Sequence, residues 1–237
     1  GSDYTSTSGS LTISAGQTSG TFNVPILADS TDENNETATI TLSSATNSSF
    51  SDDTATLTIT DDDSAPTLSV ADVTTSNETA ANATFTVSLS QASSKDISFN
   101  YATSNGTATA GSDYTSTSGS LTISAGQTSG TFNVPILADS TDENNETATI
   151  TLSSATNSSF SDDTATLTIT DDDSAPTLSV ADVTTSNETA ANATFTVSLS
   201  QASSKDISFN YATSNDTATA GSDYTSTSGS LTISAGQ

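Results

Sequence analysis

Apolar and small polar residues alternate along most of the chain with a period of two residues. Between residues 65 and 174 the alternation recurs in seven segments, with mostly Ser, Thr or Asn at the intervening positions: 68–70, 85–89, 97–101, 121–123, 132–136, 150–152 and 167–169. This period is typical of strands that bury one face. The apolar spacing of three and four residues that indicates an amphipathic helix is absent from these segments. The pattern therefore predicts an all-β structure.

Turn-forming sequences separate the seven segments. Examples are SNGT at 104–107, SAGQTSG at 124–130 and TDENN at 141–145. Seven short strands in about 110 residues fit a two-sheet sandwich of immunoglobulin type. Pro135 has no N–H to donate to a neighbouring strand, so we expect the strand that contains it to lie at a sheet edge.

The chain repeats itself with a period of 110 residues. Residues 1–127 reappear as residues 111–237, and the single difference is Gly106, which is replaced by Asp216 in the second copy. The run DDDSAP, which precedes a new alternation each time, predicts the module boundaries. We expect residues 1–64 to be the C-terminal part of one module, 65–174 a complete module and 175–237 the N-terminal part of a third. Near-identical copies also favour an excerpt of a longer tandem array.

The composition narrows the range of functions. The chain has 28 acidic residues and two basic ones, Lys95 and Lys205, for a net charge of −26, and it has no His or Cys. Without His and Cys it lacks the usual nucleophile–base systems, zinc ligands and disulfides, so we expect no enzyme. So acidic a chain repels nucleic acid and anionic lipid, and no apolar run is long enough to insert into a membrane.

Three consecutive aspartates close each repeat, at Asp61–Asp63 and Asp171–Asp173. Adjacent carboxylates repel one another, so such a run is either a solvated linker or a place where a cation binds. If successive strands alternate in direction, nine carboxylates of the complete module meet at one pole: Glu78, Asp113, Asp139, Asp142, Glu143, Glu146, Asp171, Asp172 and Asp173. This segregation favours a bound divalent cation, calcium above all, over solvation alone.

Three stretches carry a resemblance to a known family: NYATSNGTATAGSDYTSTSGSLTISAGQ (100–127), VPILADSTDENNETATITLSS (134–154) and TATLTITDDD (164–173). They resemble the Calx-beta domain, a module of sodium–calcium exchanger regulatory regions and of many bacterial surface proteins. The resemblance implies an immunoglobulin-like sandwich with Ca²⁺ at the pole formed by residues 137–146 and the final acids. By position it implies these ligands: Glu78, Asp113, Asp139, Glu143, Asp171, Asp172 and Asp173.

The pole argument and the repeat extend this set of candidate calcium ligands. In the complete module they add Asp142 and Glu146. In the partial modules they add these residues: Asp29, Glu33, Asp61, Asp62, Asp63, Glu188 and Asp223.

Two functions remain open. In the first, the chain is a calcium-stiffened structural repeat of a long extracellular or cell-surface stalk, adhesin or filament. In the second, it is a calcium-dependent ligand-recognition or calcium-sensing regulatory module. Near-identical repetition favours the first, because a spacer gains reach from copies. The expected partners are neighbouring modules of the same chain, with other copies in a fibre or bundle as further candidates, and Asn-X-Ser/Thr sequences such as those at Asn77 and Asn82 are compatible with surface glycans.

The single lysine of each module predicts a contact between modules. If successive strands alternate in direction, Lys205 lies at the pole that faces the preceding module, and the connector 174–176 is short and contains a proline. We expect Lys205 to approach residues 171–173 or 139–146, and Lys95 to approach residues 61–63 or 29–36.

Strand exchange between chains is a further alternative. Residues 175–237 of one chain would supply the strands that residues 1–64 of another lack. The two pieces would then contain GSDYTSTSGSLTISAGQ twice, and this redundancy argues against the arrangement.

Overall fold

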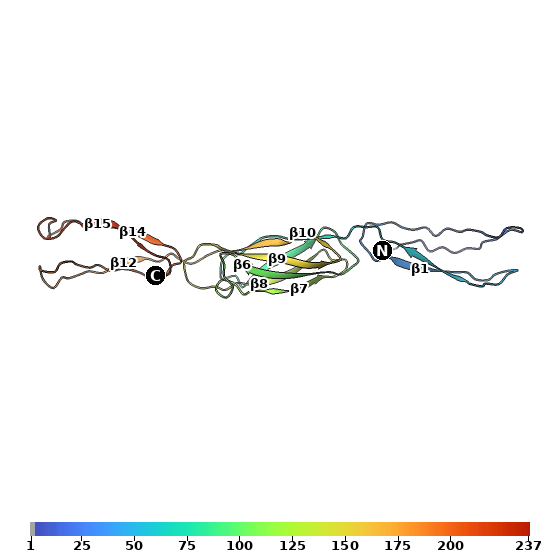
Figure 1. Cartoon of the computed structure of the whole chain (residues 1–237), viewed down its shortest axis with the longest axis horizontal. Helices are drawn as coiled ribbons and strands as arrows, with labels where there is room; N and C mark the ends of the chain where they lie inside the picture. Colours follow the sequence, from blue (N-terminus) through green and yellow to red (C-terminus); the bar gives the residue numbers. More distant parts are fainter. Residues whose placement is uncertain (1–2) are drawn as a thin grey trace.

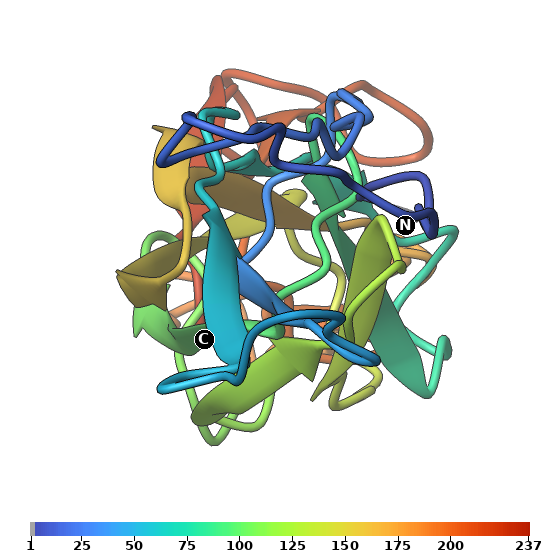
Figure 2. The ribbon, with the colours of Figure 1, turned by 90° about the vertical axis from the view of Figure 1, so that its right-hand side faces the viewer.

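The computed structural model describes residues 3–237, which form a row of three β-rich parts (Figure 1; Figure 2 looks along the row). We name them the N-terminal partial module (residues 3–64), the complete module (65–174) and the C-terminal partial module (175–237). The strands of the complete module are β3 (Thr67–Val70), β4 (Val73–Thr74), β5 (Asn82–Leu89), β6 (Ile97–Asn105), β7 (Ser118–Ile123), β8 (Ser129–Pro135), β9 (Glu146–Thr156), β10 (Ser159–Asp162) and β11 (Thr164–Ile169). No helix in the described residues is long and apolar enough to cross a membrane.

Two sheets pack face to face in the complete module. One has the order β10-β3-β5-β8 and the other the order β4-β11-β9-β6-β7. Neighbouring strands are antiparallel, except that β10 pairs with β3 and β4 with β11 in parallel. Strand β8, which ends at Pro135, is an edge strand, as its missing N–H predicts. The expected all-β sandwich is confirmed.

Burial in the complete module follows the sequence alternation. In β5, every second residue from Ala83 to Leu89 is buried and the residues between them are exposed. Phe85 is fully buried and its ring stacks on that of Phe132 from β8, with centroids 5.5 Å apart. Burying one such side chain stabilises the fold by about 1.5–3 kcal/mol, so the apolar layer between the sheets is the main source of stability.

The alternation does not predict two strands of the complete module. Strand β4 has only two residues, and β10 has one apolar side chain, Phe160. Each is fixed by pairing with a distant strand, β4 with β11 and β10 with β3. The sandwich therefore has nine strands where the sequence pattern indicates seven.

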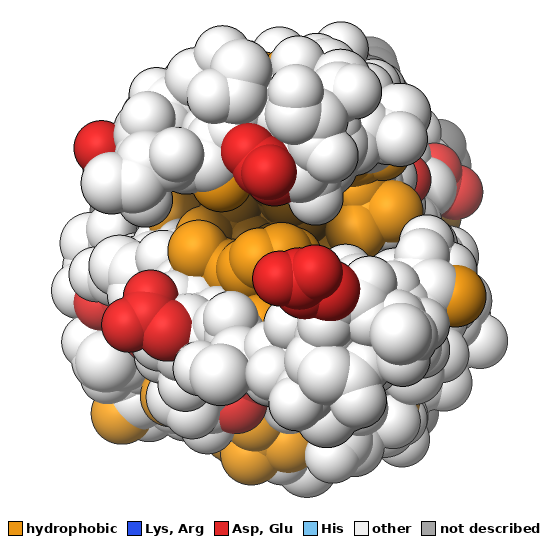
Figure 3. All heavy atoms as spheres, turned by 90° about the vertical axis from the view of Figure 1, so that its left-hand side faces the viewer, with side chains coloured by type: hydrophobic (Ala, Val, Ile, Leu, Met, Phe, Trp, Pro, Cys, Tyr) orange, Lys and Arg blue, Asp and Glu red, His pale blue; other side chains and the backbone are white. Residues whose placement is uncertain are grey.

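The partial modules retain only strand pairs between segments that are close in the sequence. In the N-terminal one, β1 (Glu36–Thr41) pairs with β2 (Thr54–Ile59). In the C-terminal one, β12 (Leu178–Val180) pairs with β13 (Val197–Leu199), and β14 (Ile207–Ala212) pairs with β15 (Ser228–Ile233). In the described residues these pairs remain two-stranded sheets, and most of the large apolar side chains around them are exposed. Figure 1 shows the partial modules as open arms at the two ends of the row, and Figure 3 shows apolar side chains in the hollow at the C-terminal end.

Candidate metal centre

The last strand and three connections of the complete module bring acids together at one pole. Oxygens of Glu78, which lies between β4 and β5, and of Asp171 and Asp173, which follow β11, lie within 4.8 Å of one another. Oxygens of Asp113, between β6 and β7, and of Asp139 and Glu143, between β8 and β9, form a second group within the same limit. Six of the nine carboxylates that alternating strand directions bring to one pole therefore lie in two close groups.

The first group is held by hydrogen bonds that join the β4–β5 connection to the end of β11. Thr170 donates its backbone N–H to Oγ1 of Thr75 (3.0 Å) and its hydroxyl to the carbonyl of Thr75 (2.9 Å). Three residues farther on, the backbone N–H of Glu78 donates to Oδ1 of Asp172 (3.3 Å). These contacts bury Glu78 beside the aspartate run.

The second group is built on local turns. Asp113 accepts a hydrogen bond from the backbone N–H of Thr109 (2.6 Å), and Asp139 accepts one from that of Thr141 (2.6 Å). The backbone N–H of Glu143 donates to Oδ1 of Asp171 (3.2 Å), so the two groups share a boundary. Each turn fixes the direction of a carboxylate, and the shared contact fixes the groups relative to each other.

The electrostatics of this pole oppose full ionisation. Burial raises the pKa of Glu78 to about 7, and the charges of Asp139 and Asp171 add to the shift. Burial also raises the pKa of Glu146 to about 7, together with a hydrogen bond to Asp113. The pKa of Asp173 is raised by burial and by Asp171 and Asp172. Protons therefore relieve the repulsion at this pole, and a cation would relieve it further.

The donor set fits calcium. All six side chains of the two groups offer carboxylate oxygens, which a hard divalent cation prefers, and they come from four separated segments of one sandwich. Buried carboxylates with raised pKa values are groups whose ionised form gains most from a bound cation.

Asp142 lies outside both groups and contacts the next module. Its carboxylate accepts hydrogen bonds from Nζ of Lys205 (2.7 Å) and from the hydroxyl of Ser203 (2.9 Å). The bond from Lys205, ahead of that from Ser203, holds the pKa of Asp142 below its usual value. The geometry thus gives Asp142 the role of a contact between modules, and its assignment as a metal ligand stays a prediction.

The same contact occurs at the other module boundary. Asp32 accepts bonds from Nζ of Lys95 (2.7 Å) and from the hydroxyl of Ser93 (2.6 Å). Lys95 also lies 3.9 Å from Asp61, as Lys205 lies 3.5 Å from Asp171. The expectation that each lysine reaches the acids of the preceding module is confirmed.

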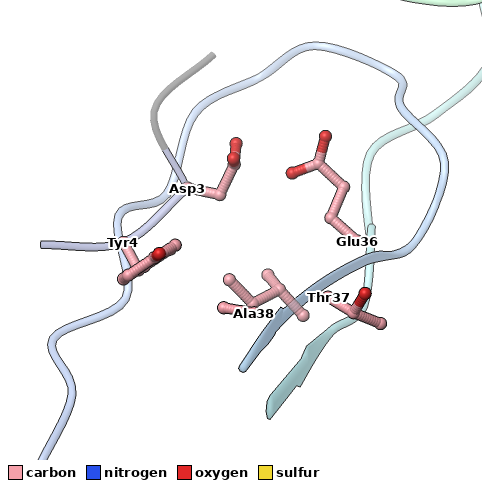
Figure 4. Close-up of a pocket in the computed structure, with 6 residues that line it drawn as sticks. Asp3, Tyr4, Glu36, Thr37 and Ala38 are labelled. Atoms are coloured by element: carbon pink, nitrogen blue, oxygen red, sulfur yellow. The ribbon is translucent and has the colours of Figure 1, made fainter. Parts of the chain in front are cut away.

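The N-terminal partial module contains a third group, formed by Asp3, Glu33 and Glu36. Figure 4 shows the carboxylates of Asp3 and Glu36 turned toward each other above Tyr4. A hydrogen bond with Asp3 raises the pKa of Glu36. The candidate set from the sequence omits Asp3 and Glu36, although the 110-residue repeat makes them the copies of Asp113 and Glu146 and would have identified them.

The remaining candidates belong to no such group in the described residues. In the complete module these are Glu146 and Asp172, besides Asp142. In the N-terminal partial module they are Asp29, Asp61, Asp62 and Asp63, and in the C-terminal one Glu188 and Asp223. Asp223 nevertheless accepts a bond from the backbone N–H of Thr219 (2.7 Å), as Asp113 does from Thr109, so its local turn is already formed.

Comparison with known families finds one family three times along the chain. The family model of the Calx-beta domain matches residues 1–63, 61–173 and 171–237. The chain belongs to the Calx-beta domain family. No curated protein sequence matches it.

Solved structures of Calx-beta domains resemble the chain at low identity. The apo form of the Calx CBD1 domain is 24% identical, with a TM-score of 0.43, over 46% of this chain and 98% of that one. CBD12 from CALX1.2 is 24% identical, with a TM-score of 0.44, over 71% of each chain. CBD12 of CALX1.1, described as a calcium binding domain, is 23% identical, with a TM-score of 0.43, over 71% of each chain.

Proposed function

We propose that this Calx-beta chain is a calcium-stiffened structural repeat of a long extracellular stalk, adhesin or filament. The observation that carries the proposal is that the acid pole of one module is also its joint to the next. Glu143 belongs to a carboxylate group and accepts a bond from the hydroxyl of Ser204 in the next module (2.6 Å). Asp171 belongs to the other group and lies 3.5 Å from Lys205.

Calcium bound at this pole would raise both the stability of the module and the stiffness of its joint to the next module. Glu78, Asp171 and Asp173 would hold one ion, and Asp113, Asp139 and Glu143 another, which would supply the positive charge that the pole lacks. Because Glu143 and Asp171 also contact the next module, fixing their side chains restricts the motion of the joint. Extracellular calcium is millimolar, so even weak sites of this kind would be filled there.

The joint itself has a geometry that repeats along the chain. Residues 142 and 203 form a β-bridge, as do residues 32 and 93, and the backbone N–H of Ser204 donates to the carbonyl of Asp142 (3.0 Å), as that of Ser94 does to Asp32 (2.9 Å). A joint repeated with the same contacts gives successive modules the same relative orientation. A straight spacer requires this property, whereas a sensor with one or two specialised modules does not.

The test is the thermal unfolding of the whole chain in calcium and in a chelator. Calcium binds the folded pole and not the unfolded chain, so chelation should lower the melting temperature of the complete module by more than about 10 °C. Small-angle scattering of the same samples should show a longer and narrower distribution of sizes in calcium. An unchanged melting curve in the chelator would refute the calcium function.

A matched pair of variants separates calcium binding from simple charge repulsion. Asp173→Asn removes a group ligand and Asp163→Asn removes the same charge at the other end of β11, where no such group lies in the described residues. We expect Asp173→Asn to raise the melting temperature in chelator, because repulsion falls, and to lower it in calcium, because a ligand is lost. Asp163→Asn should leave the calcium-dependent difference unchanged.

A further inference from the structure

Asn105, the last residue of β6, contacts both ends of a loop segment that carries one of the candidate ligands. Its Oδ1 accepts a hydrogen bond from the backbone N–H of Ala110 (3.0 Å) and another from the hydroxyl of Tyr114 (2.7 Å). Tyr114 is 1% exposed, so its hydroxyl depends on Asn105 for an acceptor. Asp113 lies between these two donors in the sequence, and the contacts of Asn105 therefore enclose the segment that carries it.

The contact with Tyr114 places Asp113 beside the connection between β8 and β9. Tyr114 forms an antiparallel bridge with Ile136, and the backbone N–H of Leu137 donates to the carbonyl of Asp113 (3.0 Å). Asp139 lies two residues beyond Leu137, and its carboxylate belongs to the same group as that of Asp113. The anchored tyrosine thus holds the backbone of Asp113 next to its partner ligand.

The contact with Ala110 acts on the direction of the carboxylate. The backbone N–H of Thr109 donates to Oδ2 of Asp113 (2.6 Å), and that of the next residue, Ala110, donates to Asn105. Two consecutive N–H groups therefore connect one short piece of backbone to both side chains. Because the two donors are adjacent, loss of the contact with Asn105 frees the donor that orients Asp113.

The copy of this loop has the same contacts, although its surroundings and one of its residues differ. Oδ1 of Asn215 accepts bonds from the backbone N–H of Ala220 (2.9 Å) and from the hydroxyl of Tyr224 (2.7 Å). Tyr224 is less buried than its counterpart in the complete module, and Asp216 occupies the one position that differs between the repeats. The arrangement therefore comes from the loop itself and not from the packing around it.

We propose that Asn105 is a positioning residue for calcium: by holding this loop it directs Asp113 toward Asp139 and Glu143, which together would bind the ion. The inference rests on the calcium function proposed above and names the residue that sets the affinity of one of the two carboxylate groups. Groups that orient metal ligands without touching the metal change the affinity by about 10- to 100-fold when they are removed.

The other carboxylate group should depend on Asn105 far less. Glu78, Asp171 and Asp173 are held by hydrogen bonds that run between the β4–β5 connection and the end of β11. Loss of Asn105 should therefore weaken one class of calcium sites much more than the other. A general destabilisation of the module would weaken both.

Calorimetric titration of the whole chain with calcium measures this effect. Asn105→Ala should lower the affinity of one class of sites by about tenfold, whereas Asn100→Ala should not. Asn100 is the matched control, because it lies in the same strand with its side chain exposed and, in the described residues, without a hydrogen bond to the loop. In a chain that already carries Asp113→Asn, Asn105→Ala should cause no further loss, since the ligand that it positions is gone.

Amide hydrogen exchange in chelator tests the positioning without calcium. The N–H of Ala110 should exchange about tenfold faster in Asn105→Ala than in the native chain, because its acceptor is lost. Asn105→Asp keeps an oxygen at this position and should restore the slow exchange. Tyr114→Phe removes only the hydroxyl and should accelerate the exchange less. The melting transition of the complete module in chelator shows that each variant is folded.

The outcomes separate this inference from the proposed function. Calcium uptake by the native chain, with an unchanged affinity in Asn105→Ala, would overturn the inference alone, even if that variant melted at a lower temperature. A further loss of affinity in the Asp113→Asn background, or an exchange rate at Ala110 that Asn105→Ala leaves unaltered, would also overturn it. A native chain that takes up no calcium would overturn both the inference and the calcium function.

Discussion

The complete and partial modules contain the same residues in two different environments. Val70 is 4% exposed in the complete module, whereas its copy Val180 is 61% exposed in the C-terminal partial module. The pair β12–β13 keeps the register of β3 with β5, yet β13 spans three residues where β5 spans eight. Local pairing is therefore set by sequences that are close together, whereas the length of the strands and the core depend on the opposite half of the module.

The reason lies in the topology of the sandwich. Both sheets combine strands from the two halves of the module, since β5 pairs with β8 and β6 pairs with β9. A half module can form its hairpins but gains little from burying them, because the covering layer comes from the other half. Two-stranded ribbons without such a layer are marginally stable in water.

Truncation of the same side chain in both environments should show the largest difference between the complete and the partial modules. Phe85→Ala should lower the free energy of unfolding by about 3–5 kcal/mol, because it leaves a cavity between the sheets. Phe195→Ala should change it by less than about 0.5 kcal/mol in dilute solution, where the side chain is in water. Urea denaturation followed by tyrosine fluorescence measures both. Equal effects of the two substitutions would contradict the difference in packing.

The pH dependence of stability should distinguish the acid pole of the complete module from ordinary surface acids. Glu78 and Glu146 have a usual pKa of 4.5 that the folded module raises to about 7, so the folded state binds more protons than the unfolded chain between these values. Stability in chelator should therefore increase as the pH falls from 7 to 4.5, by roughly 1–3 kcal/mol, and should be lost as the pH rises through 7.

Calcium should reverse this trend, because it binds the deprotonated carboxylates. Calorimetric melting temperatures at pH 5 and pH 7, with calcium and with chelator, measure the effect. The double variant Glu78→Gln with Glu146→Gln is the control and should lose most of the dependence in chelator. A chelated module that becomes steadily less stable from pH 7 to pH 5 would be evidence against the raised pKa values.

Much of this architecture follows from the sequence alone. The period of two gave the main strands, and their alternating directions gave the meeting of Glu78, Asp113 and the acid run at one pole. The alternating strand directions also predicted that Lys205 lies at the pole facing the preceding module. These features depend on the alternation of side chains along each strand and on the reversal of direction from one strand to the next. Both follow from the order of apolar, polar and turn-forming residues in the sequence.

Other features depend on tertiary contacts and could not be predicted in this way. Tyr114, from GSDY, is buried in the core, where its hydroxyl donates to Oδ1 of Asn105 (2.7 Å), and nothing in the alternation marks it as core. Asp142 and Glu143 are adjacent acids in the sequence, yet one contacts Lys205 of the next module and the other joins a carboxylate group. The two side chains differ in role only because the β8–β9 connection turns them in different directions.

The single difference between the repeats gives a smaller and more local test. Gly106→Asp copies the residue at position 216 into the complete module, where a Cβ would meet the carbonyl oxygen of Thr147 at 2.5 Å. We expect the free energy of unfolding to fall by about 1–2 kcal/mol, since the turn must shift to admit the side chain. Asp216→Gly should leave the unfolding of the complete module unchanged, and the same urea titration measures both. A Gly106→Asp module as stable as the native one would mean that this turn moves freely.

The lysine joint should give the smallest change in stability and the most local signal. Lys205 is about a third exposed, so Lys205→Gln should lower the stability only slightly, because solvent screens the pair. The bond from Lys205 is the main cause of the lowered pKa of Asp142, whose usual value is 3.8, so the substitution should raise that pKa in an NMR titration of the carboxyl carbons.

The stability that this bond adds is present above pH 3.8 and is lost as the pH falls through the lowered pKa, so the variant should differ from the native chain least in strong acid. The chain contains its own control, because Lys95→Gln should raise the pKa of Asp32 and leave that of Asp142 unchanged. If Lys205→Gln left the Asp142 titration unaltered, the contact between modules would not persist in solution.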